Sequence, residues 1–390
     1  MTELKNLNTE FLDEDTEIDD DIWSELEEED VEPEEEEITE PFDPTKIRVD
    51  TRQMTIDLVL GRIKLKEIDL APDFQRQAGI WKDAAKSRLI ESILIRIPLP
   101  AFYMDATDED KWLVIDGLQR LTALKQFVLD KQLKLRRLEY LTDVEGKTYD
   151  ELPRKYQRRI QETQITVYLI EKGTPPEVKF NIFRRINTGG LPLSPQELRH
   201  ALNQGKATKF LARLADSQEF KQATGITNTR KQLRMEDRDF VLRFLAFTLT
   251  PYTDYKAKSL DFFLNETMVD INKMSDSEIN ILEESFLGTM AIAFDIFGDY
   301  AFRKISKPNK EQKNPLNKAL FEAWSVNLSK LEEQEIDTLR ERKQYLIDNF
   351  IAILESDAKF MGSISQSTDS VSKVKYRFST IEKLLKEVLA

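Results

Sequence analysis

The segment Asp116-Gly117-Leu118-Gln119-Arg120 combines side chains and local geometry that suit phosphate binding. Glycine permits positive φ and lets the backbone approach a ligand closely. The first N–H groups of a helix are unpaired and favour an anion. An arginine in the first helical turn gains nothing from the helix dipole, so a phosphate to be held explains it better. Asp116 could then orient a water, a metal ion or Arg120. The alternative is an ordinary strand-turn-helix with a surface arginine.

Secondary structure on both sides of this turn would hold it in place. Trp112 to Ile115 predicts a buried strand, and a helix is expected from Leu118 to about Leu129. Leu99 to Met104 predicts the preceding strand. Between Trp81 and Ile97 the apolar residues recur every four positions, which indicates an amphipathic helix.

The remaining chain divides into a mixed part and a helical part. Before the amphipathic helix, Thr51 to Leu60 predicts a helix and Lys64 to Leu70 a strand; after the loop, a strand is expected over 163–170 and a helix over 177–186. Ser194-Pro-Gln-Glu197 is a capping box with proline at the first helical position. After it almost only helices are expected, over about 196–204, 207–215, 236–249, 259–270, 277–304, 315–331, 335–357 and 375–389. The fold class is therefore α+β up to about residue 200 and all-helical after it.

Composition excludes several kinds of chemistry. The 390 residues contain no cysteine, so disulfides, thiolate metal sites and thiol nucleophiles are absent, which fits a reducing cytosol. The single histidine, His200, argues against a histidine-rich metal centre and a Ser-His-Asp triad, and a capping or core role is expected for it. No segment approaches the ~20 apolar residues of a membrane span, and the acidic N-terminus does not resemble a secretory signal. A cytoplasmic protein without membrane contact is expected.

The net charge of −14 hides an uneven distribution. Residues 1–40 carry 20 of the 71 Asp and Glu residues and one of the 57 Lys and Arg residues, which leaves the rest of the chain at net +5. Such an acidic segment repels itself, so disorder is expected over 1–45. It is interpreted as a solubilising tail, as a polyanion that competes with nucleic acid for the basic body, or as a short partner-docking motif around Trp23.

Two basic runs, Lys134–Arg137 and Arg154–Arg159, have the composition of a nucleic-acid contact. Tyr140 and Tyr156 lie in or near them, and basic side chains with interleaved aromatics suit a phosphate backbone and its bases. The alternative is that both runs are solvated surface.

Four motifs in order resemble one known family. They are Pro72-Asp-Phe-Gln75-Arg76 followed by Trp81; Ile90-Glu-Ser-Ile93 followed by Ile97-Pro-Leu-Pro100; Ile115-Asp-Gly-Leu-Gln-Arg-Leu-Thr122; and Phe183-Arg-Arg-Ile-Asn187-Thr188-Gly-Gly-Leu-Pro-Leu-Ser194. Together they resemble the N-terminal domain of GmrSD-type modification-dependent restriction enzymes, in the ParB/sulfiredoxin-like superfamily. The resemblance covers roughly residues 50–265, including the helical segment that begins at Arg234.

The resemblance implies a nucleotide-binding, NTP-hydrolysing and DNA-associated module with a small mixed sheet over residues 46–200. This module lies between the acidic tail and a helical domain over 201–390. It makes Asp116 and Gln119 the expected catalytic residues. The expected phosphate- and nucleotide-binding residues are Gln75, Arg76, Gly117, Arg120, Asn187 and Thr188. The implied ligand is a nucleoside triphosphate, with or without Mg²⁺, and no metal is bound by the protein alone. DNA and a separate nuclease or defence protein are the implied partners.

Two departures from the family pattern leave the activity open. Leu118 stands where the family usually has glutamine, and if that amide positions water, hydrolysis is weakened. No HNH-type nuclease segment follows residue 270, so the chain is not expected to cut DNA alone. The alternative functions are a non-catalytic DNA- or protein-binding regulator with a vestigial pocket, and an antirestriction-like protein whose acidic tail mimics DNA.

Overall fold

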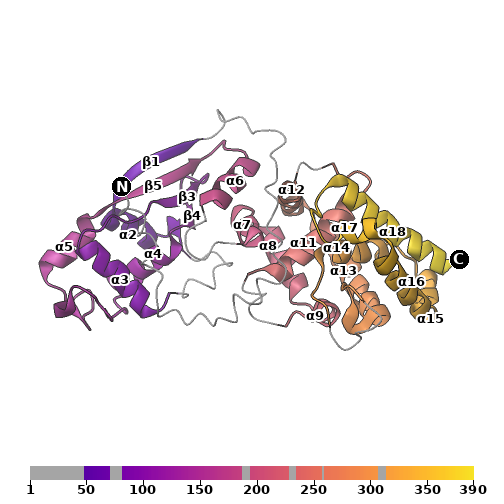
Figure 1. Ribbon diagram of the computed structural model, residues 1–390. Helices are drawn as coiled ribbons and strands as arrows, with labels where there is room; N and C mark the ends of the chain where they lie inside the picture. Colours follow the sequence, from indigo (N-terminus) through magenta and orange to yellow (C-terminus); the bar gives the residue numbers. More distant parts are fainter. Residues whose placement is uncertain (1–47, 71–80, 187–193, 228–233, 257–258, 306–312) are drawn as a thin grey trace, which may run out of the picture.

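The computed structural model describes residues 48–70, 81–186, 194–227, 234–256, 259–305 and 313–390. A mixed sheet with helices on both faces forms the N-terminal part, and the part after residue 194 is built mainly of helices (Figure 1). The predicted α+β fold class is thus confirmed. Within the described ranges no helix is long and apolar enough to cross a membrane.

Five strands make one sheet in the order β1-β5-β3-β4-β2. Their bounds are β1 (Val49–Thr55), β2 (Ile68–Asp69), β3 (Phe102–Ala106), β4 (Trp112–Asp116) and β5 (Gln164–Glu171). β1 pairs antiparallel with β5 and β3 antiparallel with β4, whereas β5–β3 and β4–β2 are parallel. The hairpin β3–β4, which leads into the candidate loop, therefore lies well inside the sheet.

Alternation along the strands sends side chains to two different cores. Phe102, Met104, Trp112 and Val114 pack on one face beneath several helices, as expected for period-two strands. The helices on this side are α2 (Ile56–Lys64), α3 (Asp83–Leu94), α4 (Leu118–Leu124) and α5 (Arg154–Glu162). The opposite face packs through a smaller cluster against α6 (Pro176–Ile186) and α7 (Pro195–Leu202).

The prediction of a helix from Thr51 to Leu60 is wrong at its start. Residues 49–55 form β1, which pairs along its whole length with β5, and the helix begins at Ile56. That pairing joins residues more than a hundred positions apart, so it overrides the local pattern. The strand predicted from Lys64 to Leu70 shrinks to Ile68–Asp69, because α2 continues to Lys64.

The helical part packs around one continuous core. Its helices are α8 (Lys206–Ala215), α9 (Gln218–Thr224), α11 (Glu236–Leu249), α12 (Leu260–Lys273), α13 (Asp276–Phe297), α14 (Lys318–Leu328), α15 (Glu333–Glu341), α16 (Lys343–Ser356), α17 (Ala358–Ser363) and α18 (Val371–Leu389). The single helix predicted over 335–357 is two helices. They meet at Arg342, whose guanidinium donates a hydrogen bond to the Val388 carbonyl at 2.6 Å. Two short helices, α9 and α17, were not predicted.

The predicted capping box at the start of α7 is confirmed. The Ser194 hydroxyl accepts from the Glu197 N–H, and the Glu197 carboxylate accepts from the Ser194 N–H. The same hydroxyl donates to the Arg234 carbonyl at 2.8 Å, just before α11 begins. This helix start therefore also joins α7 to the helical part.

A buried arginine strengthens that junction. Arg199 of α7 donates to Asp239 of α11 at 2.6 Å and to Asp261 of α12 at 2.5 Å. Burial by itself raises the pKa of Asp239, but the charges of Arg243, Lys318 and Arg199 together hold it below the ordinary value. The carboxylate is thus ionised and paired where the two parts of the chain meet.

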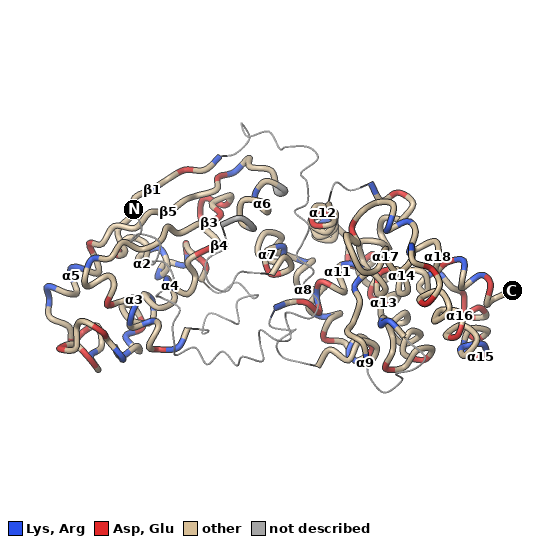
Figure 2. Tube along the Cα trace, viewed as in Figure 1, with Lys and Arg blue, Asp and Glu red and all other residues tan. Residues whose placement is uncertain are grey.

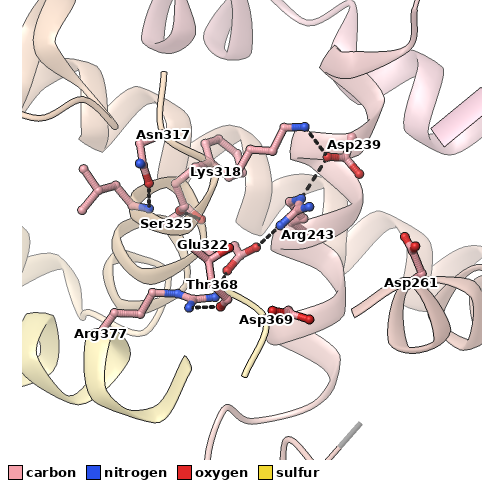
Figure 3. Close-up of polar contacts among 12 residues, drawn as sticks. Asp239, Arg243, Asp261, Asn317, Lys318, Glu322, Ser325, Thr368, Asp369 and Arg377 are labelled. Carbon is pink, nitrogen blue, oxygen red and sulfur yellow. Dashed lines mark hydrogen bonds and ion pairs between the residues drawn. The ribbon is translucent and has the colours of Figure 1, made fainter. Parts of the chain in front are cut away.

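The ion pairs continue into the C-terminal helices. Arg243 bridges Asp239 and Glu322 of α14, at 2.9 and 2.5 Å, and the other Glu322 oxygen accepts from Arg377 of α18. Figure 3 shows Glu322 between the two arginines, with Lys318 on the other side of Asp239. Since Glu322 and Arg377 are fully buried, each needs the other to offset its desolvation.

Candidate functional site

A β-bulge directs Asp116 toward Tyr103. Met104 faces Val114 across β3 and β4, but the next pair is Tyr103 with Asp116, so Ile115 is an extra residue on β4. A bulge of this kind re-aims the following side chain. The Asp116 carboxyl therefore lies at the end of β4 beside Tyr103, and the Asp116 side chain is half-buried.

Gly117 follows with the backbone conformation that the sequence predicted. Its φ is 98°, in the left-handed region, and it caps the start of α4. A Cβ atom at this position would lie 2.3 Å from the Phe102 ring. Glycine is required here both for the turn and for the close packing of the loop on β3.

Arg120 turns back from the first turn of α4 onto the ends of β3 and β4. It donates to the Asp116 carboxylate at 2.9 Å, to the Ala101 carbonyl at 3.1 Å and to the Pro100 carbonyl. Its guanidinium carbon also lies 4.3 Å from the centre of the Phe102 ring. The ordinary surface arginine considered above is therefore wrong: this side chain is an inward-facing part of the loop.

Burial acts against the charged forms of both Asp116 and Arg120. Burial raises the pKa of Asp116, and the Arg120 charge only partly offsets it; burial likewise lowers the pKa of Arg120. Three hydrogen bonds use three of the five guanidinium N–H groups. The other two make no hydrogen bond to any residue that the structure describes.

The two residues between Gly117 and Arg120 differ in their surroundings. Leu118, which replaces the usual glutamine of the resembling family, is buried in the core beneath the sheet. Gln119 is half-buried on the first turn of α4, next to Arg120 in the chain. Of the two predicted catalytic residues, Asp116 thus has a defined ion pair and Gln119 lies on the same loop.

Asp116, Gly117, Gln119 and Arg120 are all held at one strand-turn-helix. The other predicted ligand-binding residues, Gln75, Arg76, Asn187 and Thr188, lie outside the described residues. In the described ranges no group of three or more Asp, Glu or His side chains is arranged to hold a metal ion.

The sequence interpretation missed two tyrosines beside this loop. Tyr103 of β3 stacks on Tyr168 of β5, with ring centres 4.8 Å apart and planes 19° apart. Both side chains are half-buried, and the charges of Asp116 and Arg120 act on the Tyr103 hydroxyl. Strand alternation could have placed both rings on the face opposite the main core, but not their mutual contact.

The core role expected for His200 is confirmed. The side chain is buried, and its Nδ1 lies 3.2 Å from Arg238. Burial, and then the Arg238 charge, lower its pKa to about 3. The only imidazole of the chain is therefore neutral and enclosed at ordinary pH.

The basic run Arg154–Arg159 lies on α5, and Lys134–Arg137 lies beside α3, where the Arg136 N–H donates to the Ser87 hydroxyl at 2.9 Å. Arg136, Arg137, Arg154 and Arg158 are exposed, and acidic side chains alternate with them there (Figure 2). Tyr156 is buried, so it cannot stack on a base, whereas Tyr140 is 70% exposed. The loop that carries Tyr140 is anchored because the buried Glu91 carboxylate accepts three backbone N–H groups, those of residues 139–141.

Comparison with known proteins gives a result for the sheet domain alone. No curated protein matches the chain. The family model described as GmrSD restriction endonuclease, N-terminal domain, matches residues 57–203. That range contains the Asp116–Arg120 loop, both tyrosines and helix α7. The resemblance predicted from the four motifs is confirmed for residues 57–203, which match the model of the GmrSD N-terminal domain.

Proposed function

We propose that this protein is a nucleotide-binding, DNA-associated component of a prokaryotic restriction or phage-defence system, and that it binds triphosphate at the Asp116–Arg120 loop. The supporting observation is the Arg120 guanidinium, which is fixed by Asp116 and two carbonyls and keeps two N–H donors. A pre-oriented guanidinium is suited to phosphate oxygens. The family assignment supports the defence setting.

Hydrolysis is the more specific part of the proposal. Asp116 would orient the water that attacks the terminal phosphoryl group, and Gln119 would assist it. The bond between the terminal phosphorus and its bridging oxygen would break, which gives inorganic phosphate and a nucleoside diphosphate. Mg²⁺ would arrive with the nucleotide, since triphosphate oxygens and water can supply its ligands.

A non-catalytic regulator is the second candidate. It is favoured by Leu118, whose apolar side chain is buried where the family usually has an amide. In this reading the loop binds nucleotide or remains empty, and the protein acts through DNA or a protein partner. In either case cutting by HNH-type chemistry would fall to a separate nuclease, because the one imidazole is buried. We place the protein in the cytoplasm.

Calorimetry of the full chain with each nucleoside triphosphate and with tripolyphosphate tests the binding. Arg120→Ala should weaken both ligands by roughly 10- to 100-fold, since a hydrogen bond to a charged group is worth about 1.5–3 kcal/mol. Arg120→Lys keeps the positive charge but lacks the planar guanidinium with its paired N–H donors. Arg213→Ala, at an exposed arginine of α8, is the control. Unchanged affinity in a folded Arg120→Ala protein would refute the site.

Phosphate release, measured with and without DNA, separates the two candidates. Release by wild type that is lost in Asp116→Asn supports the hydrolase. Binding without release, with DNA affinity that depends on nucleotide, supports the regulator.

A further inference from the structure

The Tyr103–Tyr168 pair lies at the border of the sheet face that α6 and α7 cover. Tyr103 packs against the cluster of Ile115, Ile170 and Phe183 beneath α6 and α7. Tyr168 lies one strand further out and is not part of that cluster. Its neighbour Thr51 on the edge strand β1 is exposed. On the side away from Tyr103, Tyr168 thus lies beside the short, polar side chain of Thr51.

The adjoining surface of β1 and β5 is polar. Gln53 donates to the Thr166 hydroxyl at 2.9 Å, and both residues belong to the same face of β1 and β5 as Tyr168. Among the described residues neither tyrosine hydroxyl makes a hydrogen bond. A stacked aromatic pair with free hydroxyls, bordered by Thr and Gln, suits a planar group that has hydrogen-bonding edges.

The distance from the tyrosines to the loop fits one ligand. β4, β3 and β5 are consecutive in the sheet, so Asp116, Tyr103 and Tyr168 follow one another across about 10 Å. A phosphate held by Arg120 and a ring resting on Tyr168 would therefore lie two strands apart. The intervening Tyr103 would lie next to the sugar.

We propose that the Tyr103–Tyr168 pair is the base-binding platform of the nucleotide whose phosphates bind at the Asp116–Arg120 loop. The base lies against Tyr168, and the hydroxyl of Tyr103 hydrogen-bonds the sugar or the base edge. This inference rests on the proposed function, since it assumes a nucleotide at the loop. In this proposal Tyr103 and Tyr168 bind the base, and Arg120 binds the phosphates.

The experiment compares two ligands on the full chain by calorimetry: the tightest-binding nucleoside triphosphate and tripolyphosphate, which has no base. Tyr168→Ala should weaken the nucleotide by on the order of tenfold or more, because stacking of a base on an aromatic ring contributes strongly to binding. Tripolyphosphate affinity should not change. Tyr168→Phe keeps the ring and should bind the nucleotide within about twofold of wild type.

Two controls separate the possible failures. Tyr140→Ala, at a tyrosine that is 70% exposed on a distant loop, should leave both ligands unaffected. A folded Tyr168→Ala protein with unchanged nucleotide affinity, or with equal losses for both ligands, would overturn the platform. If wild type binds tripolyphosphate as tightly as every nucleotide, the platform also fails and the phosphate site stands. If wild type binds neither ligand, the proposed function itself fails.

Discussion

Gly117 and Phe102 are packed so closely that no side chain fits between them. A Cβ on Gly117 would lie 2.3 Å from the phenylalanine ring, which is itself fully buried. Through this contact the loop is seated on β3, where the carbonyls of Pro100 and Ala101 then receive Arg120. The position of the candidate site thus depends on glycine at residue 117, because even the methyl group of alanine would collide with Phe102.

Gly117→Ala is expected to destabilise the fold by about 2–4 kcal/mol, because overpacking and a positive φ each add a cost. Gly146→Ala is the matched control: its φ is also positive, at 78°, but no atom lies within 4 Å of the added Cβ. It should cost only about 1 kcal/mol. Urea unfolding of both variants measures the difference, and equal losses would show that the Phe102 contact is not limiting.

Asp116→Asn should change stability by less than about 1 kcal/mol at pH 7, because the pair is partly exposed and Arg120 keeps its two carbonyl acceptors. The pKa of Asp116 is raised by burial, so the folded protein favours the protonated carboxyl. The protonated Asp116 carboxyl therefore contributes fully to folding stability below about pH 4, the ordinary pKa of Asp. That contribution declines as the pH rises through the raised pKa of Asp116 in the folded protein. Wild type should lose stability relative to Asp116→Asn over that window. The opposite slope would mean that Arg120 more than offsets the burial.

The neutral His200 should make stability fall in mild acid. Its pKa of about 3 lies below the ordinary 6.5, so the unfolded chain binds the extra proton between these values. The contribution of neutral His200 to the free energy of unfolding is therefore complete above pH 6.5. It declines below that pH, by about 2 kcal/mol at pH 5. His200→Gln should remove this part of the slope. Chemical unfolding at pH 7 and pH 5 provides the test, and an unchanged slope in the variant would contradict it.

Glu322→Gln should be among the most damaging conservative changes in the helical part. The carboxylate is fully buried between Arg243 and Arg377, so its loss leaves buried positive charge uncompensated. A cost of about 3–5 kcal/mol is expected. Asp270→Asn breaks an exposed pair with Lys273 and should cost less than about 0.5 kcal/mol. Thermal and urea unfolding of the two variants would show no such contrast if water reached Glu322.

The features predicted well are those that depend on residues close in the chain. The capping box at Ser194 needs only Glu197, and the amphipathic helix α3 follows from spacing along one face. The strand-turn-helix around Gly117 was predictable because glycine is the residue that adopts its φ without strain. These local preferences, with the shift from mixed to helical patterns near residue 200, were sufficient to predict the fold class.

The sequence by itself therefore determined the α+β class, the capped start of α7 and the Asp-Gly-x-x-Arg loop, because backbone preference and side-chain spacing act over a few residues. Only the tertiary structure decided that residues 49–55 are a strand, that Arg120 turns inward and that Tyr103 meets Tyr168. It also decided that a buried ion-pair chain runs from Arg199 to Arg377. Each of these depends on partners distant in the chain, and pairing between strands and the desolvation of charge exist only once the chain has folded.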